Sequence, residues 1–399
     1  MPAPRTGINH LFIPGPTNVP DVVRMAMNLP QQDQRGPEFG AFVLSILHDL
    51  KPVFAATKAT VMMFPGSGTG AWEASMANTL SPGDRVLMAR HGHFSALWAK
   101  MAADLGLDAQ IIDLEWGAGT PVAEFARILA ADTAGTIRAV FVTHYETATG
   151  VTSDVAGVRA ALNGANHPAL LFVDGVSSIG SIPFRMDDWG VDLAVTGSQK
   201  GLMCPAGLGI LGVSEKAMAA SRVATLRRSF FSFADMEQTA QTGFFPHTPP
   251  TPLLHGLRRA LDRIAAEGLP TVFARHARLA RGIRAGVAAW GLETCAETPV
   301  LASDTVTAIR TPPGIDAREV IRVGLERYNT SFGSGLAQLA GKAFRIGHLG
   351  DLNEGMCLTA LAVAEMSLHA AGVKLAFGSG VAAAQSVYAE AAAIAIAAE

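Results

Sequence analysis

Short runs of apolar and β-branched residues recur at intervals from residue 60 to residue 213. The seven runs lie at 60–64, 85–89, 109–114, 138–144, 169–175, 192–197 and 208–213. Most of the gaps between them can hold a helix, a spacing typical of βα units, and right-handed crossovers of this kind build parallel sheets. The chain is therefore predicted to form an α/β fold with a mainly parallel seven-stranded sheet and helices on both faces.

The last part of this series departs from that spacing. Only residues 198–207 separate the sixth and seventh runs, which is short for a parallel crossover and leaves an antiparallel seventh strand open. The segment 230–252 that follows is rich in Phe, Thr and Pro and lacks a steady period. We interpret it as irregular rather than as a helix or strand.

The C-terminal part of the chain is predicted to be a smaller α+β domain. Helical spacing is present at 253–268 and 276–291, and short strands are expected near 305–311 and 343–350. The predicted division is an N-terminal arm (1–20), a large cofactor-binding domain (21–267) and a small C-terminal domain (268–399).

Charge and composition exclude several classes of function. A net charge of -3 gives no basic field for nucleic acid. The apolar stretches are shorter than the ~18 residues of a membrane span, and neither end carries a recognisable secretory or peroxisomal signal. We therefore expect a cytoplasmic protein. Cys204, Cys295 and Cys357 are scattered, so neither a disulfide framework nor a metal site is indicated.

A glycine-rich turn follows the first predicted strand. Residues 65–70 read PGSGTG, and free N–H groups at the start of the next helix can hold a phosphate group. Ser67 and Thr69 add hydroxyl groups to this turn. Its GxGxG spacing and the lack of an acidic residue after the next strand argue against dinucleotide binding. A simple tight turn remains the alternative.

Three further polar residues follow predicted strands, at the edge where open α/β sheets bind their ligands. They are Thr147, Asp174 and Lys200. A buried carboxylate needs a partner, although Asp174 is also compatible with a helix or turn cap. Pyridoxal 5′-phosphate (PLP) requires a lysine for its aldehyde, a carboxylate for its ring nitrogen and an anion site for its phosphate. Asp174, Lys200 and the 65–70 turn meet these three needs.

Six strings in the sequence resemble the class V, fold type I aminotransferases, and most closely the serine–glyoxylate and alanine–glyoxylate branch. They are PGPTNVP (14–20), SGTGAWE (67–73), HYETATGV (144–151), FVDGVSSIGS (172–181), GSQKGL (197–202) and FRIGHLGDLNE (344–354). The similarity runs in order from about residue 10 to residue 385. The pair VDGVSSIGS and GSQKG is the most specific part.

The resemblance implies a role for each matching residue. Lys200 would carry PLP as a Schiff base and Asp174 would contact the pyridine nitrogen. The phosphate would be surrounded by Ser67, Gly68, Thr69 and Gln199. Thr147 would bind the phenolic oxygen, with Val176 and Phe94 on opposite faces of the ring. Arg345 would bind the substrate α-carboxylate as a bidentate fork; its alternative is a salt bridge at the rim.

The sequence departs from the family pattern at two places. Where relatives often supply a tyrosine to the neighbouring subunit's phosphate site, this chain has Phe245 and His247, although Thr248 matches the family's threonine. Tyr145 stands where bacterial relatives often have asparagine, which would reshape the substrate side. Arg35 is a candidate second cation for a dicarboxylate substrate or, alternatively, a subunit contact.

The resemblance implies transfer of an amino group from a small L-amino acid to glyoxylate, yielding glycine and a 2-keto acid. Serine is the expected donor, with alanine and aspartate as alternatives. A cysteine desulfurase would need a mobile thiol, for which Cys204 is the candidate but is expected to be packed. A non-catalytic nucleotide-binding module is the alternative from another class. A homodimer is the expected minimum assembly, with a tetramer also possible.

Overall fold

The larger of two main sheets contains all seven predicted strands. The computed structural model describes residues 6–398. The strand order is β2-β10-β9-β8-β5-β3-β4. Their bounds are β2 (Thr60–Gly66), β3 (Arg85–Arg90), β4 (Asp108–Asp113), β5 (Ile137–Thr143), β8 (Leu170–Asp174), β9 (Leu193–Gly197) and β10 (Gly207–Val213). Strand β10 is antiparallel to both of its neighbours, as its short connection allowed, and the remaining pairings are parallel.

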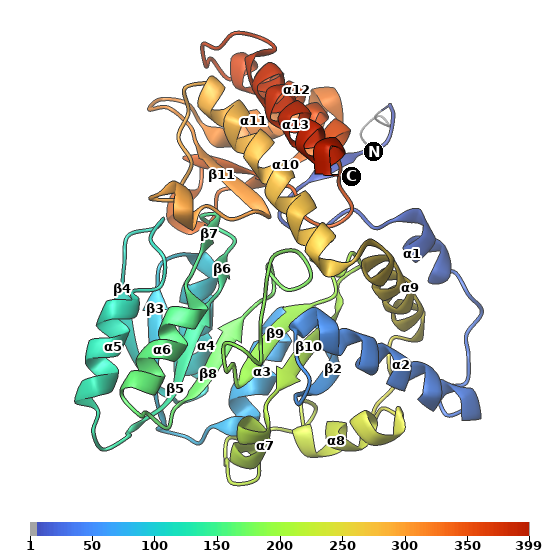
Figure 1. The fold of residues 1–399 in the computed structure, drawn as a ribbon, viewed down its shortest axis with the longest axis vertical. Coiled ribbons are helices and arrows are strands. Elements are labelled where there is room, and N and C mark those ends of the chain that lie inside the picture. Colours follow the sequence, from blue (N-terminus) through green and yellow to red (C-terminus); the bar gives the residue numbers. More distant parts are fainter. Residues whose placement is uncertain (1–5, 399) are drawn as a thin grey trace.

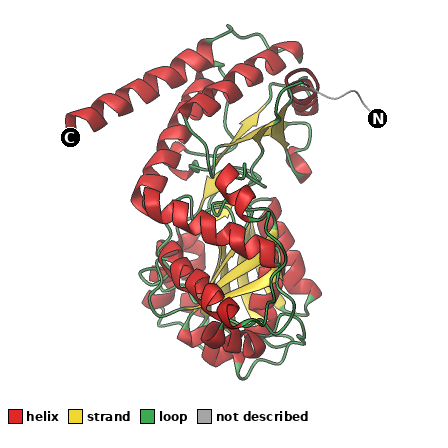
Figure 2. Cartoon of the chain, turned by 90° about the vertical axis from the view of Figure 1, so that its right-hand side faces the viewer, coloured by secondary structure: helices red, strands yellow, loops and turns green. Residues whose placement is uncertain are grey.

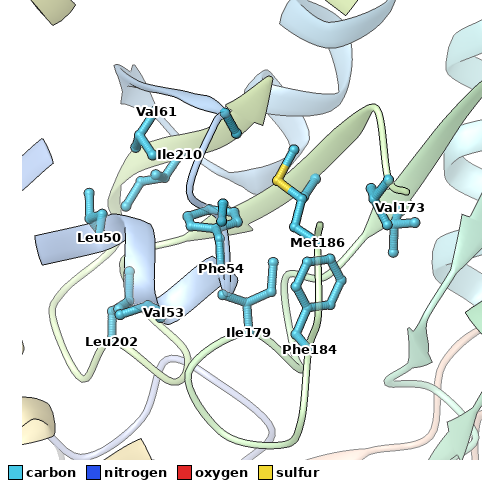
Figure 3. Close-up of a cluster of buried hydrophobic side chains, with 14 of the residues drawn as sticks. Leu50, Val53, Phe54, Val61, Val173, Ile179, Phe184, Met186, Leu202 and Ile210 are labelled. Atoms are coloured by element: carbon cyan, nitrogen blue, oxygen red, sulfur yellow. The ribbon is translucent and has the colours of Figure 1, made fainter. Parts of the chain in front are cut away.

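Helices cover both faces of this sheet, as the alternation of strands and helical gaps predicts (Figure 1). One face packs against α2 (Pro37–Phe54), α5 (Val122–Ala131), α6 (Val155–Gly164) and α9 (Thr251–Glu267). The other packs against α3 (Gly68–Thr79), α4 (His93–Asp104), α7 (Glu215–Ser221) and α8 (Phe233–Thr242). Figure 3 shows the first face, where Leu50 and Phe54 of α2 lie near Val61 and Ile210 of the sheet.

A second, four-stranded sheet has the order β1-β12-β13-β11. Its strands are β1 (His10–Phe12), β11 (Val306–Arg310), β12 (Thr330–Ser334) and β13 (Ala343–Gly347). Figure 2 shows this sheet above the larger one. Its core includes side chains of α10 (Leu269–Ala289), α11 (Ala317–Tyr328), α12 (Glu354–Ala370) and α13 (Ser379–Ala398).

Strand β1 comes from the predicted N-terminal arm, yet it pairs in parallel with β12. The N-terminal segment is therefore part of the second sheet. The division of the chain into domains at residues 21 and 268 stays a prediction. The remaining elements are α1 (Asp21–Ala26), the hairpin of β6 (Tyr145–Glu146) and β7 (Val151–Thr152), and the 3₁₀ turns η1 (Pro299–Leu301) and η2 (Ala337–Leu339).

The interpretation of residues 230–252 as wholly irregular is wrong, because α8 occupies its middle. Ser232 caps this helix by accepting a hydrogen bond from the Asp235 N–H, and Gly243 ends it in the left-handed conformation. Phe233, Met236 and Thr239 form its buried face. Packing of these buried residues, which are spaced three apart, stabilises a helix that has little helical propensity of its own. The helix is short, and the Phe and Pro residues on either side of it obscure its apolar spacing in the sequence.

No helix within residues 6–398 is long and apolar enough to cross a membrane. Within the same range, no group of three or more His, Cys, Asp or Glu side chains is arranged to hold a metal ion. Cys204, Cys295 and Cys357 are free and buried.

Candidate active site

Lys200 and Asp174 lie at the carboxyl ends of adjacent parallel strands. Asp174 is the last residue of β8 and pairs with Val195 of β9, while Lys200 follows the end of β9 by three residues. Their exposed fractions are 4% for Asp174 and 8% for Lys200. The topology of the parallel sheet therefore places an acid and an amine next to each other in a buried environment.

Burial dominates the electrostatics of Asp174. It raises the pKa of this carboxyl from its ordinary value to about 7, because the charged form loses its hydration. The backbone N–H of Val176 donates to Oδ1 at 2.9 Å and partly opposes the rise. A nearby cationic group would favour the carboxylate further, so this position suits a protonated ring nitrogen.

Lys200 is shifted in the opposite direction. The pKa of its amine is lowered to about 8, first by burial and then by the nearby positive charge of Arg345, while Asp174 opposes the change. The amine donates a hydrogen bond to the Pro14 carbonyl, so the N-terminal segment lies directly over it. An amine with a pKa near neutrality is available as a nucleophile and as a base.

The glycine-rich turn joins β2 to α3 and begins the helix beside Val176. Ser67 is the N-cap, and its hydroxyl accepts from the Gly70 N–H at 3.5 Å. A Cβ on Gly68 would lie 2.5 Å from Val176 Cγ2, and one on Gly197 would lie 2.7 Å from Gln199 Oε1 and 3.3 Å from the Gly68 nitrogen. Ser67, Gly68, Val176 and Gln199 thus form one compact group, with Thr69 exposed beside them.

Thr147 comes from the turn between β6 and β7, and Phe94 comes from the start of α4. The Thr147 hydroxyl donates to Ser177 Oγ at 2.7 Å, and both residues are buried. Phe94 is half-buried in the first turn of α4, and its N–H donates to the Glu146 carboxylate. Glu146 is the residue just before Thr147, so these two loops meet through it.

Arg345 on β13 reaches this group from the second sheet. Its Nε donates to the Ser334 carbonyl at 2.9 Å and its Nη1 to the Thr147 carbonyl at 2.8 Å. The exposed fraction of the residue is 6%, and burial lowers the pKa of its guanidinium. Its Nη2 has no hydrogen-bond partner among residues 6–398, so this side of the fork is available to an anion.

Three further residues named from the sequence are Tyr145, Arg35 and Thr248. Tyr145 is buried, and its hydroxyl donates to the Val306 carbonyl of the second sheet at 3.3 Å. Arg35 and Thr248 are exposed, and the Thr248 hydroxyl accepts from Gln34 Nε2 at 3.4 Å. Arg35 lines a surface cavity of about 280 Å³ with Phe244 and Pro249. Arg35 and Thr248 therefore belong to a surface region of this chain.

Sequence reasoning missed several residues of this site. Pro14 and Gly15 cover Lys200, since a Cβ on Gly15 would lie 2.7 Å from Lys200 Nζ. Ser177 contacts Thr147, and Glu146 joins the two loops. The local signals for them were the strings PGPTNVP, HYETATG and FVDGVSSIGS, in which Pro14 and Gly15, Glu146 and Ser177 stand.

Comparisons with known proteins agree with this geometry. The model of the family Aminotransferase class-V matches residues 30–336. A serine–glyoxylate aminotransferase of Hyphomicrobium methylovorum is 58% identical over 381 residues, covering 95% of this chain and 94% of that protein. An L-aspartate–glyoxylate aminotransferase of Paracoccus denitrificans is 53% identical over 383 residues, covering 96% and 97%. The crystal structure of pyridoxamine–pyruvate aminotransferase from Mesorhizobium loti has a TM-score of 0.91 at 30% identity, covering 98% and 100%.

A fold and a site of this kind define a fold type I enzyme that uses PLP. Within that class, the chain belongs to the class V aminotransferases, because the family match covers most of its length. It is therefore an aminotransferase with PLP as its cofactor. The expected fold, enzyme class and cofactor are confirmed.

The residues present fit this cofactor. Gln199 Oε1 is buried without a hydrogen-bond partner among residues 6–398. Turning the Gln199 amide over would direct its NH₂ group to the same place, so the position can donate to a phosphate oxygen. The lack of a side chain at Gly68 brings its backbone N–H beside Gln199 and Val176. The site thus offers hydrogen bonds that the protein itself does not use.

Proposed function

We propose that this protein transfers the amino group of L-serine to glyoxylate, producing glycine and a 2-keto acid. The observation that carries the proposal is the buried Lys200 amine, whose pKa responds to the nearby charges of both Asp174 and Arg345. The choice of donor and acceptor is supported by the 58% identical serine–glyoxylate aminotransferase of Hyphomicrobium methylovorum.

PLP, when bound, supplies an aldehyde and a conjugated ring that takes up the electrons released at the substrate Cα. We assign Lys200 to the aldehyde and Asp174 to the ring nitrogen. Ser67, Gly68, Thr69 and Gln199 would hold the phosphate. Thr147 would contact the phenolic oxygen, and Phe94 and Val176 would enclose the ring between them.

Lys200 is proposed to move the proton during the reaction. With PLP bound, the neutral form of its amine would act as the base that removes the proton from the substrate Cα. A pKa lowered to about 8 by burial keeps a useful fraction of the amine in this form near neutral pH. The same amine, held three residues after the end of β9, would also carry that proton to the cofactor.

Arg345 is proposed to bind the α-carboxylate that serine and glyoxylate share. The Ser334 and Thr147 carbonyls hold its Nε and Nη1, so the guanidinium is oriented before substrate arrives. Arg345 could orient both serine and glyoxylate, because the two substrates would bind in the same site one after the other. A buried arginine also raises the local affinity for anions.

The relative from Paracoccus denitrificans makes aspartate the second candidate donor, and alanine remains a third. A dicarboxylate donor needs a second cation, and Arg35 is exposed on this chain's surface. We propose that Arg35 and Thr248 reach the site of a neighbouring subunit in a homodimer, or in a tetramer built from such dimers. A cytoplasmic location remains part of this proposal.

A donor panel tests the proposal. Purified enzyme is incubated with glyoxylate and serine, alanine or aspartate, and glycine is measured. We expect glycine from serine at the highest rate. The Lys200→Ala variant should lose the visible absorbance that borohydride bleaches, and its activity should fall by at least about a thousandfold, because both the covalent anchor and the base are removed. Absence of glycine with every donor would refute the assignment.

A further inference from the structure

Glu146 is a buried carboxylate with no part in the proposed chemistry. Its exposed fraction is 0%, and it stands between Tyr145 and Thr147 in the β6–β7 hairpin. The carboxylate accepts four hydrogen bonds, all from the protein. The donors are the Phe94 N–H (3.2 Å), the Ser95 N–H (2.9 Å), the Ser95 hydroxyl (3.0 Å) and the Ala148 N–H (3.1 Å).

The start of α4 compensates the charge of this carboxylate. A helix N-terminus carries a partial positive charge and free N–H groups, and here Phe94 and Ser95 supply them. No Lys or Arg side chain within residues 6–398 forms a salt bridge with Glu146. The carboxylate therefore depends on these donors, and they depend on it, since buried N–H groups without partners are costly.

Gly92 is required for this contact. A Cβ at position 92 would lie 2.1 Å from Glu146 Cγ and 2.2 Å from its Cδ, so no side chain fits there without displacing the carboxylate. The backbone of Gly92 is extended, a conformation that any residue adopts. The constraint at this glycine is thus the space taken by Glu146 rather than backbone strain.

The four donors come from the first turn of α4 and from the turn between β6 and β7, and each of these segments carries a proposed cofactor contact. Phe94 lies in the first turn of α4, and Thr147 lies between Glu146 and Ala148. We propose that Glu146 is a positioning residue that holds Phe94 and Thr147 at a set separation, so that the ring-face contact assigned to Phe94 and the phenolic-oxygen contact assigned to Thr147 can be made together. The inference rests on the cofactor contacts assigned to these two residues under the proposed function.

Glu146 is not proposed as an acid or base. Both oxygens point to donors in the loops, Oε1 to Phe94 and Ala148 and Oε2 to Ser95. A glutamine at this position keeps one acceptor oxygen and has an NH₂ group in place of the other. That NH₂ group would face an N–H donor. Glu146→Gln therefore changes little in volume but disturbs the junction between the loops.

The chain offers a matched control in Glu365. This glutamate is also buried and accepts from three N–H groups, those of Trp290 Nε1 (2.9 Å), Gly378 (2.7 Å) and Gly380 (2.6 Å). It joins α12 to the start of α13, away from Lys200. Glu365→Gln therefore reproduces the loss of a buried acceptor without touching the cofactor loops.

The experiment compares the unmodified protein with Glu146→Gln, Gly92→Ala and Glu365→Gln. PLP is removed from each, its dissociation constant is measured by titration, and the visible circular dichroism of the reloaded protein is recorded with its melting temperature. We expect Glu146→Gln and Gly92→Ala to raise the dissociation constant by about tenfold or more and to change the visible dichroism. Glu365→Gln should melt lower but bind PLP within about twofold of the unmodified protein.

Unchanged PLP binding and dichroism in both Glu146→Gln and Gly92→Ala would overturn the inference. Equal losses of affinity in Glu365→Gln would also overturn it, since they would reflect general instability. If Glu146→Gln does not fold, Gly92→Ala decides, because it keeps the carboxylate and only displaces it. Failure of the unmodified protein to bind PLP would instead refute the proposed function itself, so the two failures are distinguishable.

Discussion

At the scale of single residues, burial moves the acid and the amine of the site toward neutrality from opposite sides. The pKa of Asp174 rises to about 7 and that of Lys200 falls to about 8, in each case mainly through loss of hydration. Each charged form is costly without a partner, and the two groups only partly satisfy each other. A bound cofactor with a cationic ring would relieve Asp174.

This cost predicts how the stability of the cofactor-free protein depends on pH. The pKa of Asp174 is about 7 in the folded protein and has the ordinary value of 3.8 in the unfolded chain. Between these two pH values the folded protein therefore holds a proton that the unfolded chain has released. The resulting stability is complete below pH 3.8 and is lost as pH rises through about 7. The loss is expected to be of the order of a few kcal/mol. Asp174→Asn should remove most of this dependence.

Thermal melts of PLP-free protein at pH 5 and pH 8 measure the effect. The melting temperature of the unmodified protein should fall more between these two values than that of Asp174→Asn. The exposed Asp188 supplies the control, and Asp188→Asn should follow the unmodified protein. The same fall in Asp174→Asn as in the unmodified protein would contradict the assignment of the high pKa to Asp174.

At the scale of elements, the N-terminal segment joins the two sheets above Lys200. Its β1 strand pairs with β12, and the residues after β1 pass close to β13. A Cβ on Gly347 would lie 2.2 Å from the Ile13 oxygen. The Thr17 hydroxyl donates to the Lys200 carbonyl at 3.3 Å, and the Thr17 N–H donates to the Gln199 carbonyl at 3.2 Å. This segment therefore forms one wall of the site.

Gly15 is the position in this wall that tolerates a side chain least. Its φ of +125° disfavours other residues, and an added Cβ would lie 2.6 Å from Lys200 Cδ. We predict that Gly15→Ala lowers turnover by about tenfold or more, because a small displacement of Lys200 disrupts its alignment with substrate. Steady-state rates and the rate at which added PLP becomes borohydride-reducible measure the effect.

Gly7 provides the matched control in the same segment. Its φ is +73°, yet an added Cβ meets nothing within 4 Å. Gly7→Ala therefore imposes backbone strain without contact at the site, and its activity should stay within about twofold of the unmodified enzyme. Equal losses in the two variants would show that strain in the segment, rather than contact with Lys200, accounts for the effect.

At the scale of the whole molecule, exposed apolar side chains gather on the segments that flank Arg35 and Thr248. The exposed fractions are 39% for Val22, 60% for Met25, 44% for Leu29, 43% for Phe230 and 37% for Phe244. Apolar side chains exposed together are typical of contacts between proteins. The proposed homodimer would cover this region and place Arg35 and Thr248 near the partner's site.

Charges introduced into this region test the assembly. We predict that the double variant Met25→Glu/Leu29→Glu shifts the mass in solution from about twice 41.6 kDa toward 41.6 kDa and lowers activity in parallel, since burying a carboxylate at an interface is costly. Light scattering and glycine formation are measured on the same samples. Val300→Glu, at a residue with an exposed fraction of 91%, is the control. A fully active monomer would contradict the proposal.

The sequence by itself was sufficient for the features that repeat locally. The apolar runs predicted all seven strands of the larger sheet. The inner strands are apolar because they are buried on both faces, whereas β4, at the edge of the sheet, is only partly buried. The polar residues after those runs identified Asp174 and Lys200, because parallel strands bring their carboxyl ends to one edge. The helical spacing of apolar residues predicted helices α9 and α10.

Only the tertiary structure decided the features that depend on distant contacts. Strand β1 has three residues, and its partner β12 begins at Thr330, so no local period marks it. Helix α8 is stabilised by packing of Phe233 and Met236 against the sheet rather than by its own propensity. The junction of the Phe94 and Thr147 loops at Glu146 likewise needs donors from residues about fifty positions apart. Local patterns specify which residues are buried, but a buried charge selects its partners only once the chain has folded around it.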